Sequence, residues 1–230
     1  MMTIAAARRF RDRATCFVGV GLPSVAACLA REQHAPRITL IYESGSIGAK
    51  PTMPPLSIAD PEIAETADFI VGVHEIFAYW LQGGRVDMGF LGAAQIDRFA
   101  NLNSTVIGNY NSPKVRLPGV GGASHIAAHA REIVVIARQT PKAFVARVDF
   151  VSTARPHGPT AVVTDLGVLE RRHGKDELIL TARHAGVTLD EIRAATGWPL
   201  EVATDLIETP APTADELRAL RYLNTSTQLA

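Results

Sequence analysis

Short apolar runs rich in β-branched residues alternate with helix-like segments along the first 140 or so residues. The segments 24–33 and 75–82 have helical spacing. The strand-like runs cover 15–20, 38–42, 69–73, 86–91, 105–107 and 133–137. This order is typical of βαβ units, in which a helix crosses between two parallel strands. It predicts an α/β fold with a mostly parallel sheet flanked by helices.

The alternation stops near Arg147. Three strand-like runs then follow one another, with a polar turn at 173–175, and predict a hairpin or meander: 161–164, 167–170 and 177–181. Thr188 and Thr213 each precede acidic residues, as the N-cap residues of helices do. We therefore expect an additional C-terminal β-hairpin and helices beside the parallel sheet.

Charge and cysteine content narrow the class of protein. Lys plus Arg and Asp plus Glu both number 23, so no net charge directs the chain to nucleic acid or to an anionic membrane. Cys16 and Cys28 lie in apolar segments, which favours free, packed thiols and a cytoplasmic location. Arginines precede the apolar segment 14–30 as in a signal peptide, but the Gly-Pro-containing stretch 19–23 interrupts that segment. No stretch has the length of a membrane span.

Glu43 is the most unusual residue of the parallel part. It follows the apolar run 38–42 directly and is itself followed by Ser44 and Gly45. An unpaired buried carboxylate is costly. Either Glu43 caps a turn or it is presented for chemistry.

Glycines mark two further candidate sites. Gly119, Gly121 and Gly122 lie within four residues, where backbone N–H groups can converge on an anion or oxyanion; a tight turn into a helix near Ser124 is the alternative. Gly19-Val20-Gly21 follows a predicted strand as in a dinucleotide fingerprint, but Ser24 replaces the third glycine.

Two polar groups complete the list of candidates. His125 and His129 have the spacing of a helical metal pair, but no third ligand is evident, so we expect no metal site. The polar segment around Asn103 forms either turns or ligand contacts.

Several motifs, in order, resemble one known family. They are Glu43-Ser44-Gly45 after a strand, Gly83-Gly84 leading to VDMGFLGAAQIDRFANLNSTVIGNY, then KVRLPGVGGASHIA, and finally AVVTDLGVLE. Together they resemble the β (B) subunit of family I CoA-transferases, most of all the glutaconate and 3-oxoacid types. The likeness runs from about residue 14 to residue 221, which implies a single domain of this β-subunit type over 1–230, with an N-terminal arm at 1–13 and a flexible tail at 224–230.

The resemblance implies an enzyme that moves CoA between an acyl-CoA thioester and a carboxylic acid by a ping-pong route. Glu43 matches the family's acceptor glutamate, which forms a covalent glutamyl-CoA thioester. On the same basis the oxyanion or CoA-binding candidates are Gly45, Gly119, Gly121, Gly122, Gln95 and Asn103. No permanently bound cofactor is expected, because the CoA thioester is a substrate. The implied partner is a separately encoded α (A) subunit in an α2β2 or larger hetero-oligomer, with no nucleic acid and no membrane.

Three alternatives remain open at this point. Relatives of the same fold hydrolyse CoA thioesters or open rings, and retained Glu43 favours transfer over that chemistry. A non-catalytic CoA-binding or structural subunit would not need both the Glu-Ser-Gly and the Gly-Val-Gly-Gly motifs. A nucleotide-linked oxidoreductase lacks its third glycine and a well-placed ribose-binding acid.

Overall fold

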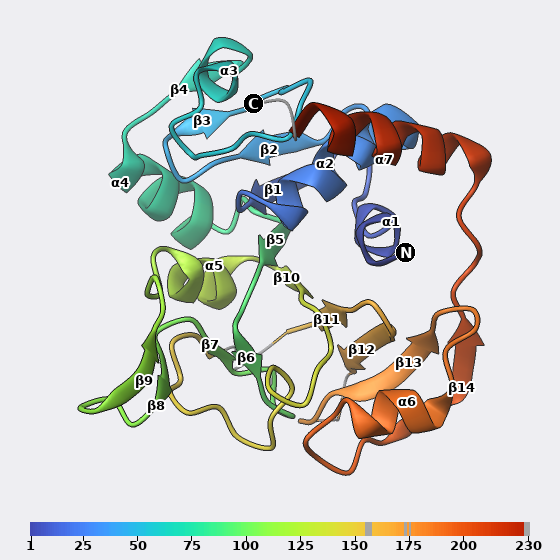
Figure 1. The fold of residues 1–230 in the computed structure, drawn as a ribbon. Helices are drawn as coiled ribbons and strands as arrows, with labels where there is room; N and C mark the ends of the chain where they lie inside the picture. Colours follow the sequence, from blue (N-terminus) through green and yellow to red (C-terminus); the bar gives the residue numbers. More distant parts are fainter. Residues whose placement is uncertain (155–157, 173, 175, 228–230) are drawn as a thin grey trace.

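The protein is built around one twisted sheet (Figure 1). The computed structural model describes residues 1–154, 158–172, 174 and 176–227. Ten strands form the sheet in the order β14-β13-β12-β11-β10-β5-β1-β2-β3-β4. Their bounds are β1 Thr15–Val18, β2 Thr39–Ile41, β3 Ser46–Ile47, β4 Phe69–Ile70, β5 Met88–Leu91, β10 Glu132–Ile136, β11 Thr160–Val163, β12 Gly167–Arg171, β13 Ile179–Arg183 and β14 Val202–Glu208.

Strands β2, β1, β5, β10 and β11 run parallel and form the middle of the sheet. Strands β3 and β4 extend the sheet beyond β2 through antiparallel pairing. Strands β12 and β13 extend it beyond β11 in the same way. Strand β14 lies parallel to β13 at the edge. The predicted α/β class, with a mostly parallel sheet and an additional C-terminal hairpin, is confirmed. Of the predicted turn at 173–175, only Gly174 lies within the described residues.

One predicted strand belongs elsewhere. The run at 105–107 forms β8 (Val106–Gly108), which pairs with β9 (Pro113–Arg116) in a separate hairpin. Its position follows from the Gly-Asn-Tyr-Asn-Ser segment after it, because those turn-forming residues fold the chain straight back. A second small sheet pairs β6 (Gln95–Ile96) with β7 (Leu102–Asn103).

Helices cover both faces of the sheet (Figure 1). The first group is α1 (Met2–Ala7), α2 (Leu22–Gln33) and α7 (Ala214–Thr227); the second is α4 (Val73–Glu75), the π-helix η1 (Ile76–Gln82) and α5 (Ala123–His129). Two short helices lie apart from these groups, α3 (Pro61–Glu65) and α6 (Leu189–Ala194). The predicted helix at 75–82 is thus mostly π-helix, a wider form that is often found at functional sites.

Alternate strand residues belong to two cores. In β1, Cys16 and Val18 pack with the α1–α2–α7 face, whereas Phe17 packs with the η1–α5 face. In β10, Val134 packs with the α1–α2–α7 face and Ile133 packs with the η1–α5 face. This period of two explains why strands buried on both faces read as continuous apolar runs.

Both ends of the chain contribute to the first core. Ile4 in α1 is fully buried and Phe10 belongs to the same core, so much of the predicted N-terminal arm at 1–13 packs against the sheet. Arg8 joins α1 to α7 through an ion pair with Glu216 at 2.7 Å. Helix α7 continues to Thr227, beyond the predicted start of a flexible tail at 224, because Leu223 is buried against this core and no Gly or Pro interrupts the helix.

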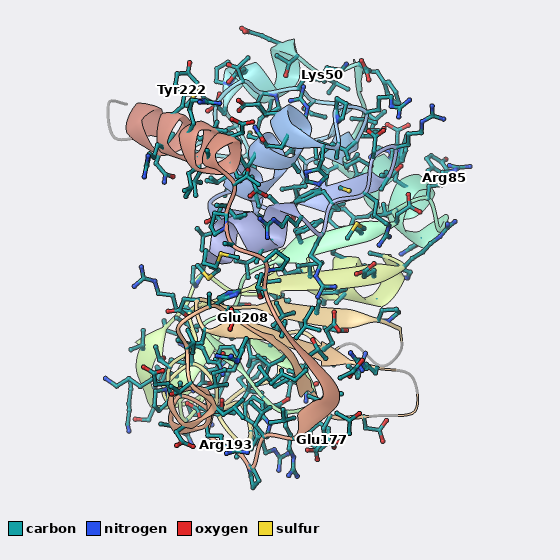
Figure 2. The ribbon with its side chains drawn as sticks, turned by 90° about the vertical axis from the view of Figure 1, so that its right-hand side faces the viewer. Lys50, Arg85, Glu177, Arg193, Glu208 and Tyr222 are labelled. Carbon is teal, nitrogen blue, oxygen red and sulfur yellow. The ribbon has the colours of Figure 1, made fainter. Side chains whose placement is uncertain are left out.

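Figure 2 shows the strands stacked from the end near Lys50 to the end near Glu177, with α7, which carries Tyr222, across one side. Within the described part of the chain, the helices are too short or too polar to cross a lipid bilayer.

Candidate active site

A cavity of about 320 Å³ opens where three neighbouring parallel strands end. Its walls include Phe17 and Val18 at the end of β1, and Phe90 and Leu91 at the end of β5. Glu43, two residues after β2, completes this side. The carboxyl ends of strands are where open α/β sheets bind ligands.

A tight turn between β2 and β3 presents Glu43. The N–H of Gly45 donates to the Tyr42 carbonyl at 3.0 Å, and the N–H of Tyr42 donates to the Ser46 carbonyl at 3.1 Å. Glu43 and Ser44 therefore occupy the corner of the turn. Tyr42 is fully buried, whereas Glu43 is half-buried and faces the cavity.

Gly45 is required by the geometry of this turn. Its φ angle is +107°, and a β-carbon there would overlap the carbonyl oxygen of Val71. The Val71 N–H also donates to the Gly45 carbonyl at 3.0 Å, which ties the turn to the segment after β4. Gly45 thus shapes the turn that carries Glu43 and is not among the residues that line the cavity.

The Glu43 carboxylate has no hydrogen bond or ion pair to any described residue. It does not cap a turn, which was the alternative explanation of its position. Much of the surrounding wall is apolar, including Phe17, Leu91 and Ile126. A carboxylate without protein partners beside such a wall is available to react with a bound molecule.

A glycine-rich loop forms the opposite wall of the cavity. Gly119 and Gly121 have φ angles of +104° and +49°, and both line the cavity together with Val120 and Gly122. Within the described residues, no acceptor engages the N–H groups of Val120, Gly121 and Gly122. These donors remain available to an oxygen atom in the cavity.

Gly122 brings this loop close to the glutamate. A β-carbon on Gly122 would lie 3.0 Å from Glu43 Oε1 and 2.7 Å from the ring of Phe77. Phe77 belongs to η1 and contacts His125 edge-on, with ring centroids 5.6 Å apart. Only glycine therefore fits between the carboxylate and this aromatic ring.

The Gly19-Val20-Gly21 segment lines the cavity without the third glycine of a dinucleotide site. Gly21, with φ of +83°, is the N-cap residue of α2, and the Ser24 hydroxyl donates to the Gly19 carbonyl at 2.9 Å. Gly19 and Val20 form part of the wall. Two residues of the glycine pattern thus line the cavity, and Ser24 stands where a dinucleotide fingerprint has its third glycine.

Gln95 and Asn103 are not among the residues that line the cavity. Both are buried, and Asn103 Nδ2 donates to Gln95 Oε1 at 2.8 Å and to the Val106 carbonyl at 2.6 Å. Ser104, the neighbour of Asn103, does line the cavity. The segment that the family likeness indicated therefore reaches the cavity through Ser104, whereas Gln95 and Asn103 do not line it.

Some lining residues carry no local signal in the sequence. Ile58 comes from the loop before α3, and Ser104 from the link between β7 and β8. Pro118 and Val120 lie in the glycine loop itself, and only the glycines around them pointed there. Ile58 and Ser104 reach the site through long-range packing, which the local sequence does not reveal.

Other candidate nucleophiles and ligands lie outside the cavity. Cys16 and Cys28 are buried free thiols, and burial raises the pKa of each to about 12, so neither provides a thiolate near neutral pH. His129 Nδ1 is hydrogen-bonded to the His125 carbonyl at 2.9 Å. Over the described residues, no cluster of three or more metal-ligating side chains occurs.

Comparison with known proteins points to one family. The family model for coenzyme A transferase matches residues 1–195. The β (B) subunit of 3-oxoadipate CoA-transferase from Pseudomonas knackmussii is 52% identical, over 100% of this chain and 94% of that protein.

Two solved structures have the same fold. Glutaconate CoA-transferase from Acidaminococcus fermentans superposes with a TM-score of 0.88 at 26% identity, over 96% of this chain and 92% of that one. The decarboxylase AibA/AibB superposes with a TM-score of 0.87 at 29% identity, over 96% and 91%. Components of ring-cleaving hydrolases are more distant relatives. The chain belongs to the coenzyme A transferase family and is the β (B) subunit of an enzyme that transfers CoA.

Proposed function

We propose that Glu43 is the nucleophile that carries CoA during transfer. The observation that supports this role best is a carboxylate at the carboxyl end of β2 that has no partner among the described residues and lies 3.0 Å from the position of a β-carbon on Gly122. Within the described residues, the N–H groups of Val120, Gly121 and Gly122 have no acceptor, and these three residues line the same cavity.

The reaction proceeds in two halves. A Glu43 oxygen attacks the thioester carbonyl of acyl-CoA, and CoA thiolate leaves as a mixed anhydride forms. The thiolate then attacks the glutamyl carbonyl, which releases the first acid and leaves CoA bonded to Glu43 as a thioester. The acceptor acid reverses both steps, so the route is ping-pong.

Each attack creates a negatively charged oxygen on a tetrahedral carbon. The N–H groups of Val120, Gly121 and Gly122 are the donors that we propose for this oxyanion. Removing one such donor typically costs about 2.7–4 kcal/mol of transition-state stabilisation. Contacts to the remote parts of CoA supply the energy that holds the weak carboxylate nucleophile against the thioester.

For the substrate we propose a 3-oxo acid of the 3-oxoadipate type. This proposal is supported by 52% identity, over the whole chain, to one component of 3-oxoadipate CoA-transferase. The partner is a separately encoded α (A) subunit, since the similar proteins are named as one of two subunits or as two-component enzymes. We propose an α2β2 or larger assembly, to be measured by light scattering of the copurified complex.

Glu43→Gln tests the nucleophile in that complex. We expect CoA transfer to 3-oxoadipate to fall by at least about 1,000-fold, because the nearly isosteric amide cannot form the anhydride. Glu65→Gln, at the exposed end of α3, is the matched control and should retain full activity. Normal transfer by Glu43→Gln would exclude the proposed role.

A further inference from the structure

A polar network lies directly behind the glycine loop. Gln95 and Asn103 face each other across the β6–β7 pair, with 5% and 0% of their surface exposed. Gln95 Nε2 donates to Asp149 Oδ2 at 3.2 Å, and the Asp149 N–H donates to Gln95 Oε1 at 3.1 Å. The Gly108 N–H donates to the same carboxylate oxygen at 2.8 Å, so the network also holds the β8–β9 hairpin. Both buried amides therefore have hydrogen-bond partners in the protein and lie outside the residues that line the cavity.

The network fixes the backbone of the segment after β7. Asn103 Oδ1 accepts from the N–H groups of Thr105 at 3.0 Å and Val106 at 3.2 Å. Ser152 Oγ accepts from the Ser104 N–H at 2.9 Å, and its hydroxyl is hydrogen-bonded to that of Thr105 at 2.6 Å. Segment 104–106 is thus held by two side chains, Asn103 beside it and Ser152 from a distant part of the chain.

That segment in turn holds the glycine loop. The Gly119 N–H donates to the Ser104 carbonyl at 2.8 Å, and the Leu117 N–H donates to the Thr105 carbonyl at 3.0 Å. A continuous series of hydrogen bonds therefore runs from Gln95 through Asn103 to the wall of the cavity.

The glycine loop depends on these anchors because it has few others. A β-carbon on Gly119 or Gly121 would meet no atom within 4 Å, and Val120 and Gly121 are exposed, so this part of the loop borders open space. Its conformation, with two positive φ angles, is set by hydrogen bonds at its two ends. At the far end, the Ala123 N–H donates to the Val120 carbonyl at 3.0 Å.

We propose that Gln95 and Asn103 are positioning residues, which aim the N–H groups of Val120, Gly121 and Gly122 at the reacting oxygen without touching substrate. The inference rests on the proposed oxyanion role of that loop. Loosening the anchor should misplace the donors in the transition state, where a shift of about 1 Å costs on the order of 100-fold in rate. Substrate binding, which uses other contacts, should change much less.

To test the proposal, Gln95→Leu is compared with the control variant Gln139→Leu, each in the complex with the α partner. Gln139 is an equally buried amide, at 4% exposure, that donates to Thr196 Oγ1 and accepts from Thr164 Oγ1, both at 2.9 Å, and it lies outside the cavity. Both variants lose a buried amide network and should lose similar stability in urea. We expect kcat to fall at least about 10-fold in Gln95→Leu alone, with KM for acyl-CoA within about threefold. Similar kcat values in the two variants would overturn the proposal.

Ser152 provides a milder test if Gln95→Leu does not fold. Ser152→Ala frees the Ser104 N–H and should lower kcat, whereas Ser152→Thr keeps the hydroxyl and should recover most of it. Equal kcat in Ser152→Ala and the unmodified enzyme would also overturn the proposal. Glu43→Gln, assayed in parallel, separates the positioning role from the proposed nucleophile role. If Glu43→Gln is inactive and Gln95→Leu has the same kcat as Gln139→Leu, the positioning role is wrong and the nucleophile role stands.

Discussion

At the scale of single residues, the site depends on where glycine allows the backbone to go. Glu43 is exposed to the cavity because Gly45 closes a turn that no other residue fits. Gly122 lets the second wall come within reach of the Glu43 carboxylate. The charge at the end of an apolar run is visible in the sequence, but whether Glu43 has a partner depends on the folded structure, in which none of the described residues pairs with it.

Gly45 and Gly21 form a matched pair that tests the role of glycine in the turn. Both have positive φ angles, but a β-carbon on Gly21 would meet nothing within 4 Å, whereas one on Gly45 would overlap the Val71 carbonyl. Gly21→Ala should lose only the free energy of holding alanine at φ +83° and ψ −137°, on the order of 1–3 kcal/mol. Gly45→Ala should lose more than about 3 kcal/mol, because backbone must also shift. Urea unfolding measures both, and equal losses would show that the turn relaxes around the new methyl group.

At the scale of elements, the sequence predicted the buried central strands well and missed the exposed edge strand β14. Strands β1, β2, β5 and β10 are buried on both faces, so their apolar runs identify them directly. Strand β14 was missed because most of its residues are exposed at an edge and show no clear alternation. The π-helix was read as an ordinary helix, since the two forms share a similar apolar pattern over seven residues.

Helix starts were predictable because their signal is local. Thr188 Oγ1 accepts from the Glu191 N–H at 3.2 Å, and Glu191 in return accepts from the Thr188 N–H at 2.7 Å. Thr213 and Glu216 form the same reciprocal pair. The position of Gln95 and Asn103 behind the wall was not predictable, because it depends on Asp149 and Ser152, about fifty residues further along the chain.

A buried histidine links three strand ends and should make stability depend on pH. His184 Nε2 donates to the Thr164 carbonyl at 2.9 Å, and Nδ1 accepts from the Thr209 hydroxyl at 3.0 Å. Burial lowers the pKa of His184 from its ordinary value of 6.5. The unfolded chain therefore binds the proton more readily, so this contribution to stability is present above pH 6.5 and is lost as the pH falls through and below that value.

Urea unfolding at several pH values checks this expectation. The free energy of unfolding should fall between about pH 7.5 and pH 5.5, and His184→Gln should show a smaller fall, because its amide keeps a neutral donor and acceptor and does not titrate. An identical pH profile in the variant would show that His184 does not cause the dependence.

At the scale of the whole molecule, one sheet carries the cavity at the ends of its central strands, and helices from both ends of the chain pack on one of its faces. Helices α1 and α7 each pack against α2, and the Arg8–Glu216 ion pair joins the end of α1 to α7. The cavity lies at the carboxyl ends of β2, β1 and β5, and the meander β11–β13 extends the sheet away from it (Figure 1). Loops gathered from distant parts of the sequence thus form one site on a rigid base.

The central claim is that CoA becomes bonded to Glu43 during turnover. The most direct measurement incubates the copurified complex with acyl-CoA, traps the thioester with borohydride or hydroxylamine, and maps the peptides by mass spectrometry. We predict a modification on Glu43 that appears only with acyl-CoA and is absent from Glu43→Gln. An unmodified Glu43 in a complex that turns over fully would contradict the claim.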